Sequence, residues 1–248
     1  MVSALQVRPL VIADRVAGTA CSHCDVRDQS VCSAISDADL HHLAAASVRL
    51  AFGKGQTFIN EGDPATDFFN VTRGTVKLFK LLPDGRQQIT GFASVGHFLG
   101  LAVSRTYAFS AEAVEDTALC RFSRPNLRRL LADFPALERR LLDTACNELA
   151  TAQEQMLLLG RKTAAERVAS FLTSWGKSSA ACGRSAEIHL PMTRGEIADY
   201  LGLTIETVSR VFSRFRAEKR ISTPSHDEVV LLDLPWLIRL ADGNASLH

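Results

Sequence analysis

The chain has 248 residues, 46% of them hydrophobic and 22% charged, with a formal net charge of +1 at pH 7. This length fits one or two domains with a buried core, and the charge excludes a whole-chain attraction to nucleic acid or membrane. No stretch approaches the roughly 18 consecutive apolar residues of a membrane-spanning helix. No signal-peptide pattern opens the chain, so we expect a cytoplasmic protein with reduced cysteines.

Residues 1–33 show little hydrophobic periodicity and hold a cluster of thiols. Cys21, Cys24 and Cys32 lie within the twelve residues of CSHCDVRDQSVC. Structural disulfides are rare in the cytoplasm, so we interpret these side chains as thiols or metal ligands. Metal centres held by cysteine commonly use four ligands, which raises the question of where a fourth ligand lies.

A short helix and then a β-rich region follow the cysteines. The sequence SDADLHHLAAAS, residues 36–47, predicts the helix. Over residues 48–122, glycines recur between short runs rich in Val, Ile, Phe and Thr. The clearest strand pair flanks Pro83-Asp84-Gly85, a turn in which Pro presets φ and Gly accepts a positive one. Many short strands with regular turns predict a β-roll or jelly roll, here assigned to residues 34–132.

The pattern becomes helical over residues 134–160, which read as one long segment. Its apolar side chains are spaced 4, 4, 3, 4 and 3 residues apart, close to a coiled-coil seam. These side chains are Leu141, Ala145, Leu149, Ala152, Met156 and Leu159. Such a helix spans roughly 40 Å, which is long for a small core. We therefore expect residues 133–162 to form a dimerisation helix, with packing on its own domain as the alternative.

Residues 190–221, LPMTRGEIADYLGLTIETVSRVFSRFRAEKRI, carry the most informative pattern of the chain. Thr193 and Glu196 form a capping box that opens one helix. Gly202 ends this helix, and Thr204 caps the next one. Two helices joined by a turn of about three residues that contains Gly are typical of a helix-turn-helix.

The second of these helices has two distinct faces. Its inward side chains are expected to be Ile205, Val208, Phe212 and Phe215. On the outer face, Arg210 can donate two hydrogen bonds to guanine, and Glu206 can accept one from cytosine. Residues 204–220 hold five basic and two acidic side chains, which favours phosphate contacts. The alternative is a solvated charged face without a DNA partner. The predicted DNA contacts are Thr193, Thr204, Glu206, Ser209, Arg210, Ser213 and Arg216.

The segments around the helix-turn-helix complete a domain assigned to residues 163–248. A further helix starts near Thr163 with AAERVASFLTSW. After the helix-turn-helix, RISTPSHDEVVLLDL predicts two short strands around Pro224-Ser225, and WLIRLA predicts a final helix. Together these elements predict a winged helix-turn-helix, so that the whole chain belongs to the α+β class.

The order of β-roll, long helix and winged helix-turn-helix resembles the CRP/FNR superfamily of bacterial transcription regulators over nearly the whole chain. MTRGEIADYLGLTIETVSR is very similar to the FNR-type recognition segment. That family reads DNA with Glu, Ser and Arg, which correspond to Glu206, Ser209 and Arg210. Relatives of the cyclic-AMP type carry an Arg where this chain has Ile205. The resemblance therefore implies an FNR-like half-site, TTGAT, in a double-stranded palindrome.

The resemblance also implies a use for the cysteines. FNR proteins bind an oxygen-labile 4Fe-4S cluster through three N-terminal cysteines and one distant cysteine in the β-roll. Cys21, Cys24 and Cys32 match the first three, and Cys120 in VEDTALCRF matches the fourth. The spacing C-x2-C-x7-C differs from that of the enteric protein but occurs in some alphaproteobacterial relatives. Four thiolates are the ligand set of such a cluster.

The resemblance implies a regulator, not an enzyme, that binds DNA as a homodimer while its cluster is intact at low oxygen. The two recognition helices would lie one DNA turn, ~34 Å, apart. Contacts with RNA polymerase are implied by the family, with the hairpin at residues 83–86 as a candidate surface. FNR-type proteins commonly carry an Asp on the long helix where this chain has Ala152. We therefore expect the cluster-free protein to keep some affinity for its own copy.

Other interpretations of the cysteines remain open. The three clustered thiols could bind zinc together with His41 or His42. They could also act as redox-active thiols or form a disulfide, in a regulator that answers to another signal. Cys146 and Cys182 are expected to be bystanders.

Control by a cyclic nucleotide is not expected. Nucleotide-binding relatives use a Gly-Glu pair at the ribose and an Arg-Ser or Arg-Thr pair at the cyclic phosphate. Here Gly100 is followed by Leu101, and Ser110 is preceded by Phe109. An anionic ligand would lose its guanidinium partner and meet an apolar wall.

Overall fold

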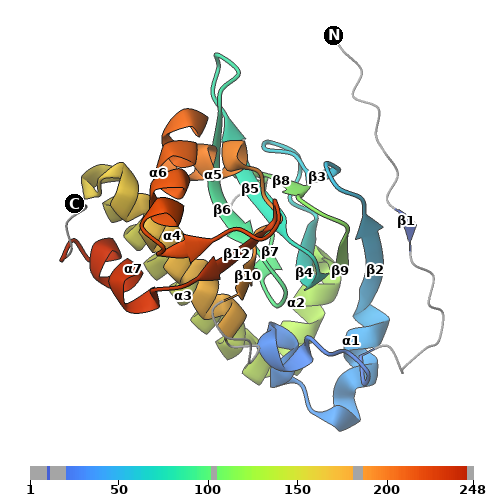
Figure 1. Cartoon of the computed structure of the whole chain (residues 1–248). Coiled ribbons are helices and arrows are strands. Elements are labelled where there is room, and N and C mark those ends of the chain that lie inside the picture. The colour runs from blue at the N-terminus through green and yellow to red at the C-terminus, as the bar shows by residue number, and fades with distance from the viewer. Residues whose placement is uncertain (1–9, 12–20, 102–104, 181–186, 245–248) are drawn as a thin grey trace. The chain divides into compact units, whose positions relative to one another are not determined.

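The computed structural model describes residues 10–11, 21–101, 105–180 and 187–244 of the chain (Figure 1). The chain divides into two compact units, residues 1–149 and 150–248. Among the described residues, no helix combines the length and the apolar character that crossing a membrane requires.

Two antiparallel sheets form the centre of the first unit. One has five strands in the order β1 (Leu10–Val11), β2 (Ser47–Phe52), β9 (Thr117–Ser123), β4 (Asp67–Arg73) and β7 (Phe98–Leu99). The other has four, in the order β3 (Thr57–Ile59), β8 (Ser110–Ala113), β5 (Val76–Leu81) and β6 (Gln87–Ala93). Leu50, Val71 and Leu119 of the first sheet share one core with Val76 and Ala111 of the second. The predicted β-roll is thus confirmed, because the two sheets bury their apolar faces against each other.

A second core lies on the other face of the five-stranded sheet, beneath a layer of short and long helices. These are η1 (Arg27–Gln29), η2 (Val31–Ala34), η3 (Asp37–Asp39), α1 (Leu40–Ala46), α2 (Arg124–Asp133) and α3 (Pro135–Arg161). Phe68 and Phe122 of the sheet meet Leu43 of α1, Leu127 of α2 and Leu137 of α3 there. The strands alternate between the two cores because successive side chains point to opposite faces of a sheet.

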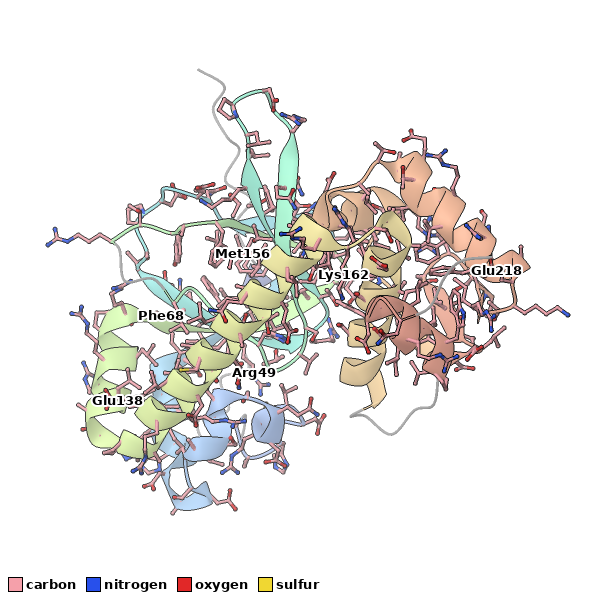
Figure 2. The ribbon with its side chains drawn as sticks, turned by 90° about the vertical axis from the view of Figure 1, so that its left-hand side faces the viewer. Arg49, Phe68, Glu138, Met156, Lys162 and Glu218 are labelled. Carbon is pink, nitrogen blue, oxygen red and sulfur yellow. The ribbon has the colours of Figure 1, made fainter. Side chains whose placement is uncertain are left out.

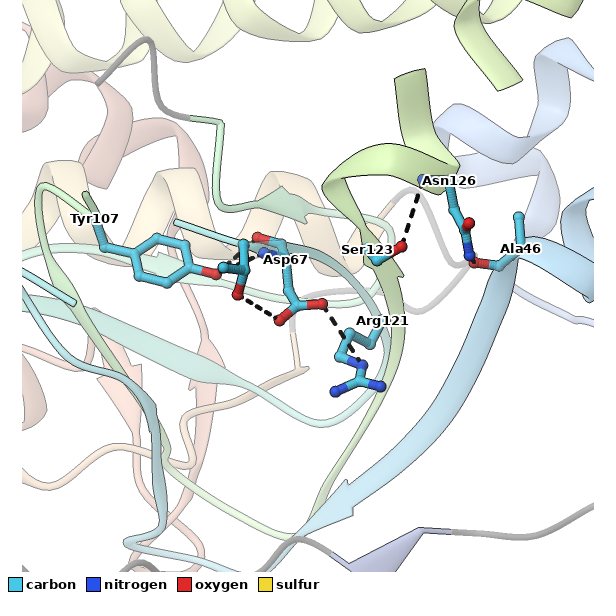
Figure 3. A network of polar contacts seen from close by, with 7 residues as sticks. Ala46, Asp67, Tyr107, Arg121, Ser123 and Asn126 are labelled. Atoms are coloured by element: carbon cyan, nitrogen blue, oxygen red, sulfur yellow. Dashed lines mark hydrogen bonds and ion pairs between the residues drawn. The ribbon is translucent and has the colours of Figure 1, made fainter. Parts of the chain in front are cut away.

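Polar contacts fix the ends of β4 and β9 to the segments beside them (Figure 3). The Tyr107 hydroxyl donates to the carbonyl of Asp67 at 2.8 Å and accepts the backbone N–H of Asp67 at 3.1 Å. Ser123 caps α2 by accepting the N–H of Asn126 at 3.4 Å, and Asn126 Nδ2 donates to the carbonyl of Ala46 at 3.2 Å. These bonds hold the layer of helices against the sheet.

The β5–β6 hairpin turns where the sequence predicts. Gly85 has a φ of 86°, in a region that glycine adopts without steric cost. Leu82 donates its N–H to the carbonyl of Arg86 at 2.8 Å and so closes the loop. The hairpin projects from its sheet (Figure 1), and Leu81 and Leu82 at its end are 61% and 43% exposed.

The second unit is a winged helix-turn-helix, as predicted. Its elements are α4 (Ala164–Ala180), β10 (Glu187–His189), α5 (Arg194–Leu201), α6 (Ile205–Ala217), β11 (Ile221–Ser222), β12 (Glu228–Leu231) and α7 (Leu234–Ala241). The wing strands β11 and β12 join β10 in a sheet of order β10-β12-β11. Strand β10 is not predicted from the sequence, because three residues after a polar stretch give too short a pattern. The α+β class with β-roll, long helix and winged helix-turn-helix is confirmed.

Arg167 of α4 joins two helix ends within the second unit. Its guanidinium donates to the carbonyls of Leu159 in α3 and Leu201 in α5, each at 2.9 Å. Gln155 of α3 adds a bond from Nε2 to the carbonyl of Tyr200 at 3.0 Å. Carbonyls in the last turn of a helix have no partner within that helix, so these side chains satisfy groups that would otherwise need water.

Candidate functional site

The four predicted ligand cysteines lie around one pocket of the first unit. Cys21, Cys24 and Cys32 come from the N-terminal segment, and Cys120 comes from β9, almost ninety residues later. The pocket encloses about 350 Å³ of space between atoms, part of it open to solvent. Its other lining residues are Arg27, Leu40, Leu43, Ser47, Arg49, Asn70 and Phe122.

The sheet places Cys120 at the base of this pocket. Leu119 points into the core between the sheets, so Cys120, the next residue on β9, faces the helical layer. Arg49 of β2 and Asn70 of β4 lie directly opposite Cys120 on the two neighbouring strands. Directly opposite residues share one face of a sheet, so the thiol lies between a guanidinium and an amide (Arg49 is labelled in Figure 2).

Short turns hold the N-terminal thiols over that base. The backbone N–H of Arg27 donates to the carbonyl of Cys24 at 3.1 Å. Ser30 Oγ accepts the N–H of Cys32 at 3.2 Å. Val31 and Ile35, 3% and 1% exposed, anchor the segment in the same core that includes Cys120. The sequence here lacks helical or strand periodicity because the chain folds as 3-10 turns around the pocket.

Burial is the main cause that raises the pKa of three of the thiols. It raises the pKa of Cys32 to about 11 and that of Cys120 to about 12, and it raises the pKa of Cys21 as well. The thiols add to one another's shift, while Arg49 acts in the opposite direction on the pKa of Cys21 and Cys120. These thiols are therefore protonated at neutral pH, and a metal that binds them has to displace their protons.

The remaining candidate ligands lie elsewhere. His41 and His42 are exposed; His41 Nδ1 is 3.0 Å from the carbonyl of Ala38, and the ring of His42 packs against Phe134. Cys146 is exposed on α3, and Cys182 lies outside the described residues. The described cysteines, Cys146 included, are free thiols. Within the described ranges, no three His, Cys, Asp or Glu side chains are grouped closely enough to hold a single metal ion.

The two pocket residues directly opposite Cys120 are not predicted from the sequence. Arg49 lies in strand β2, and nothing in the sequence around it indicates that its side chain lies opposite Cys120. Asn70 does leave a signal, because an Asn inside the apolar run Phe68-Phe69-Asn70-Val71 is unusual in a strand. Its side chain is 2% exposed. A buried amide of this kind indicates a specific polar partner.

The helix-turn-helix has the local bonds that the sequence predicts. Thr193 Oγ1 accepts the N–H of Glu196 at 3.2 Å, and Glu196 Oε2 accepts the N–H of Thr193 at 2.8 Å. Gly202 ends α5 with a φ of 61°. Thr204 caps α6 by accepting the N–H of Thr207 at 3.3 Å. Helix α6 therefore begins at a fixed point in the chain.

The outer face of α6 is polar and open to solvent. Glu206, Ser209, Arg210, Ser213 and Arg216 are all exposed. Hydrogen bonds from its own backbone and from Thr204 lower the pKa of the Glu206 carboxyl, which keeps this acceptor ionised. Three further contacts hold the arginines. Arg210 Nη2 donates to Thr207 at 3.3 Å, and Arg216 donates to Ser213 at 3.0 Å and to Thr223 of the wing at 3.3 Å.

The inner face of α6 differs from prediction at one position. Val208, Phe212 and Phe215 are buried, but Ile205 is 48% exposed, because the first turn of α6 extends beyond the core. Arg194, which the sequence analysis does not single out, stacks its guanidinium 3.7 Å from the ring centre of Phe212. Burial, helped by the nearby Arg216, lowers the pKa of Arg194 to about 10, so this side chain is still charged at neutral pH.

An apolar stripe runs along α3, shifted by one residue from the predicted seam at its start. Leu141 is 8% exposed and packs in its own core, whereas the adjacent Leu142 is 64% exposed. Further along, Leu149 and Met156 are 61% and 65% exposed (Figure 2 labels Met156). Ala145, before Leu149, and Ala152, before Met156, are also exposed, and Leu159 is half-buried. The exposed positions follow one another at 3, 4, 3 and 4 residues, the spacing of a coiled-coil seam.

Two residues of the segment that would meet a cyclic nucleotide in relatives have partners within the chain. Ser110 Oγ accepts the backbone N–H of Glu61 at 3.0 Å. Phe109, which precedes it, packs against the core between the two sheets. Residues 102–104, next to Leu101, lie outside the described residues.

Comparison with known proteins agrees with this architecture. A family model described as a Crp-like helix-turn-helix domain matches residues 166–240, and one described as a cyclic nucleotide-binding domain matches residues 49–134. The nitrogen fixation regulation protein FixK of Bradyrhizobium diazoefficiens is 42% identical over 228 residues, which cover 92% of this chain and 96% of that protein.

Two further similarities extend over most of the chain. The transcriptional activator protein FnrL of Cereibacter sphaeroides is 34% identical over 231 residues, 91% of this chain and 93% of that protein. The solved structure of FixK2 from Bradyrhizobium japonicum is similar with a TM-score of 0.74 and 34% identity, over 82% of this chain and 99% of that one.

Proposed function

The chain belongs to the CRP/FNR family of transcription regulators, and we propose that its cysteine pocket holds a 4Fe-4S cluster that makes DNA binding respond to oxygen. The protein is a DNA-binding transcription activator and not an enzyme. The observation that carries the proposal is the convergence of Cys21, Cys24, Cys32 and Cys120 on one pocket.

The residues of the pocket fit such a group. Four cysteines are its ligand set, and the thiols come from two segments that no local motif joins. Arg27 and Arg49 place positive charge beside a site that becomes negative when the thiols lose their protons. When bound, the cluster supplies an oxygen-sensitive covalent link between the N-terminal segment and β9.

The same core offers a physical connection from the thiols to the dimerisation helix. Cys120 packs in one cluster of apolar residues with Ile35 of the N-terminal segment and with Leu137 and Leu141 of α3. Displacement of the N-terminal segment would therefore change what the first turns of α3 pack against. A packed core responds to such a change by moving between discrete arrangements.

DNA recognition follows from the exposed faces of α3 and α6. We propose that the stripe of α3 pairs with its own copy in a homodimer, which sets two recognition helices ~34 Å apart. Glu206, Ser209 and Arg210 then read a TTGAT half-site in each half of a palindrome. The exposed Leu81 and Leu82 at the β5–β6 hairpin support this hairpin as the surface for RNA polymerase. No cyclic nucleotide is needed.

Anaerobic purification tests the proposal directly. We expect brown protein with a broad visible absorption shoulder and about four iron and four sulfide per chain. Air should bleach the absorption and weaken binding to a TTGAT palindrome in parallel. Colourless protein with stoichiometric zinc, or binding that is the same with and without air, would replace the proposal by the zinc or thiol alternative.

A further inference from the structure

Two residues that line the cysteine pocket carry buried polar atoms without a partner among the described residues. Among the described residues, the buried side-chain atoms without a hydrogen-bond partner are Arg27 Nε, Asn70 Oδ1 and Arg220 Nε. The first two belong to residues that line the pocket with the four cysteines. Buried polar groups are nearly always paired in folded proteins, so two unpaired groups at one pocket indicate a missing partner there.

The position of Asn70 makes its amide the more informative of the two. It is 2% exposed, lies directly opposite Cys120 on the adjacent strand, and faces the same side of the sheet. The two ends of an Asn amide exchange by rotation about one bond, and which end faces a site is an assignment, not an observation. The amide can therefore present either its oxygen or its NH2 group to the pocket.

The chemistry of the pocket decides between these two ends. Thiolate and sulfide sulfurs accept hydrogen bonds and cannot donate them, so a partner rich in such sulfurs requires the NH2 group. Arg27 Nε carries an N–H and is a donor in any case. Hydrogen bonds to the sulfurs and local charge set the reduction potential of an iron–sulfur site. A donor favours the state with the greater negative charge, because that state has the stronger acceptor.

We propose that Asn70 and Arg27 are positioning residues that donate hydrogen bonds to the sulfur atoms of the bound cluster and thereby raise its reduction potential. This inference rests on the proposed function, because it needs a sulfur-rich occupant. In the cluster-free protein the same amide is a defect, since a buried atom without a partner lowers stability.

The main test uses Asn70→Leu, which keeps the approximate volume and removes both polar atoms. The matched control is Thr72→Val, an isosteric change on the same strand whose hydroxyl bonds to the carbonyl of Ala118 at 3.0 Å, outside the pocket. Anaerobic redox titration follows the uptake of one electron by the cluster, from the 2+ to the 1+ state. Asn70→Leu should shift this equilibrium about tenfold towards the oxidised state, which lowers the reduction potential by about 59 mV. Thr72→Val should match wild type.

Arg27→Lys provides an independent second variant. It keeps the positive charge but removes the Nε–H donor, so the potential should fall in the same direction by a smaller factor. Should Asn70→Leu misfold, Asn70→Ala removes the same donor at a reduced volume, and its potential should fall likewise.

A second measurement needs no cluster. In the cluster-free protein, Asn70→Leu should unfold at the same or a higher temperature than wild type, because it removes a buried amide oxygen that has no partner among the described residues. Equal potentials for wild type, Asn70→Leu and Thr72→Val would overturn the inference and leave the proposed function intact. A wild-type protein that assembles no cluster would overturn both.

Discussion

The cysteine pocket and the helix-turn-helix differ in how completely the chain satisfies its own polar groups. In the helix-turn-helix, Thr193, Glu196 and Thr204 pair the exposed ends of both helices, and the outer arginines of α6 have partners in their own unit. Among the described residues, an amide oxygen of Asn70 and the Nε–H of Arg27, both on side chains that line the pocket, have none. The exposed face of α6 that we propose to read DNA is thus held by bonds within its own unit. The two pocket residues each keep an unpaired buried atom, as does Arg220 beyond the end of α6.

The largest expected effect comes from removing one thiol of the pocket. Cys120→Ser should abolish 4Fe-4S assembly and DNA binding at low oxygen, because a serine hydroxyl is a poor substitute for a thiolate ligand. Iron and sulfide analysis of anaerobically purified protein measures this. Cys146→Ser, on the exposed face of α3, is the control and should keep full iron content. Full iron content in Cys120→Ser would remove Cys120 from the ligand set.

The next largest effect concerns base recognition by the outer face of α6. Arg210→Ala should cost ~1–3 kcal/mol at the preferred site and relax the preference at one G·C pair, because a pair of hydrogen bonds to guanine is lost. Arg216→Ala should weaken binding to all sequences alike if its guanidinium contacts phosphate. Affinities for a TTGAT palindrome and its single-base variants, at fixed salt, separate the two. Unchanged base preference in Arg210→Ala would contradict the assignment of α6 as the recognition helix.

Two glycine substitutions, one in the turn between α5 and α6 and one inside α3, test the backbone geometry of that turn. Gly202→Ala should lower the free energy of unfolding of the second unit by about 1–2 kcal/mol, because its φ of 61° is a left-handed conformation. Its new Cβ would also lie 3.3 Å from Leu159 Cδ2. Gly160→Ala, in α3 with open space around it, should instead raise stability by up to about 1 kcal/mol. Denaturant unfolding of both variants gives the sign of each change in the free energy of unfolding. Equal changes would mean that a side chain at position 202 does not strain the turn.

The smallest expected effect concerns the dimer. In a parallel pair, Ala152 of α3 would meet its own copy. Ala152→Asp would then set two carboxylates against each other, at a cost of roughly 1 kcal/mol for charges about 4 Å apart in water. Sedimentation of the cluster-free proteins at micromolar concentration should show a weaker dimer for the variant and measurable dimer for wild type. If wild type is already monomeric and Ala152→Asp is indistinguishable from it, the seam through Ala152 is misassigned.

Local elements were predictable because their signals lie within a few residues of one another. The capping box at Thr193, the αL end at Gly202 and the turn at Gly85 each depend on bonds to near neighbours. Strand β10 is not predictable in this way, because its pairing with β12 depends on residues some forty positions away. The exposed stripe of α3 begins at Leu142 and not at the predicted Leu141, because spacing alone does not show which of two adjacent leucines packs in the core of its own unit.

The pocket was predictable only in part. The link between the N-terminal thiols and Cys120 came from the family resemblance, since nothing in the spacing of the cysteines identifies a partner in β9. Arg49 and Asn70 were not predicted, because the alignment of β2, β9 and β4 that places them beside Cys120 is a property of the folded sheet. The lone Asn in an apolar strand was the one available clue.

The bonds of Arg167 have a mechanical consequence. Because its guanidinium holds the carbonyls of Leu159 and Leu201 at once, and Gln155 holds that of Tyr200, the last two turns of α3 cannot swivel independently of α5. Rotation of this end of α3 about its own axis would therefore turn α5 with it.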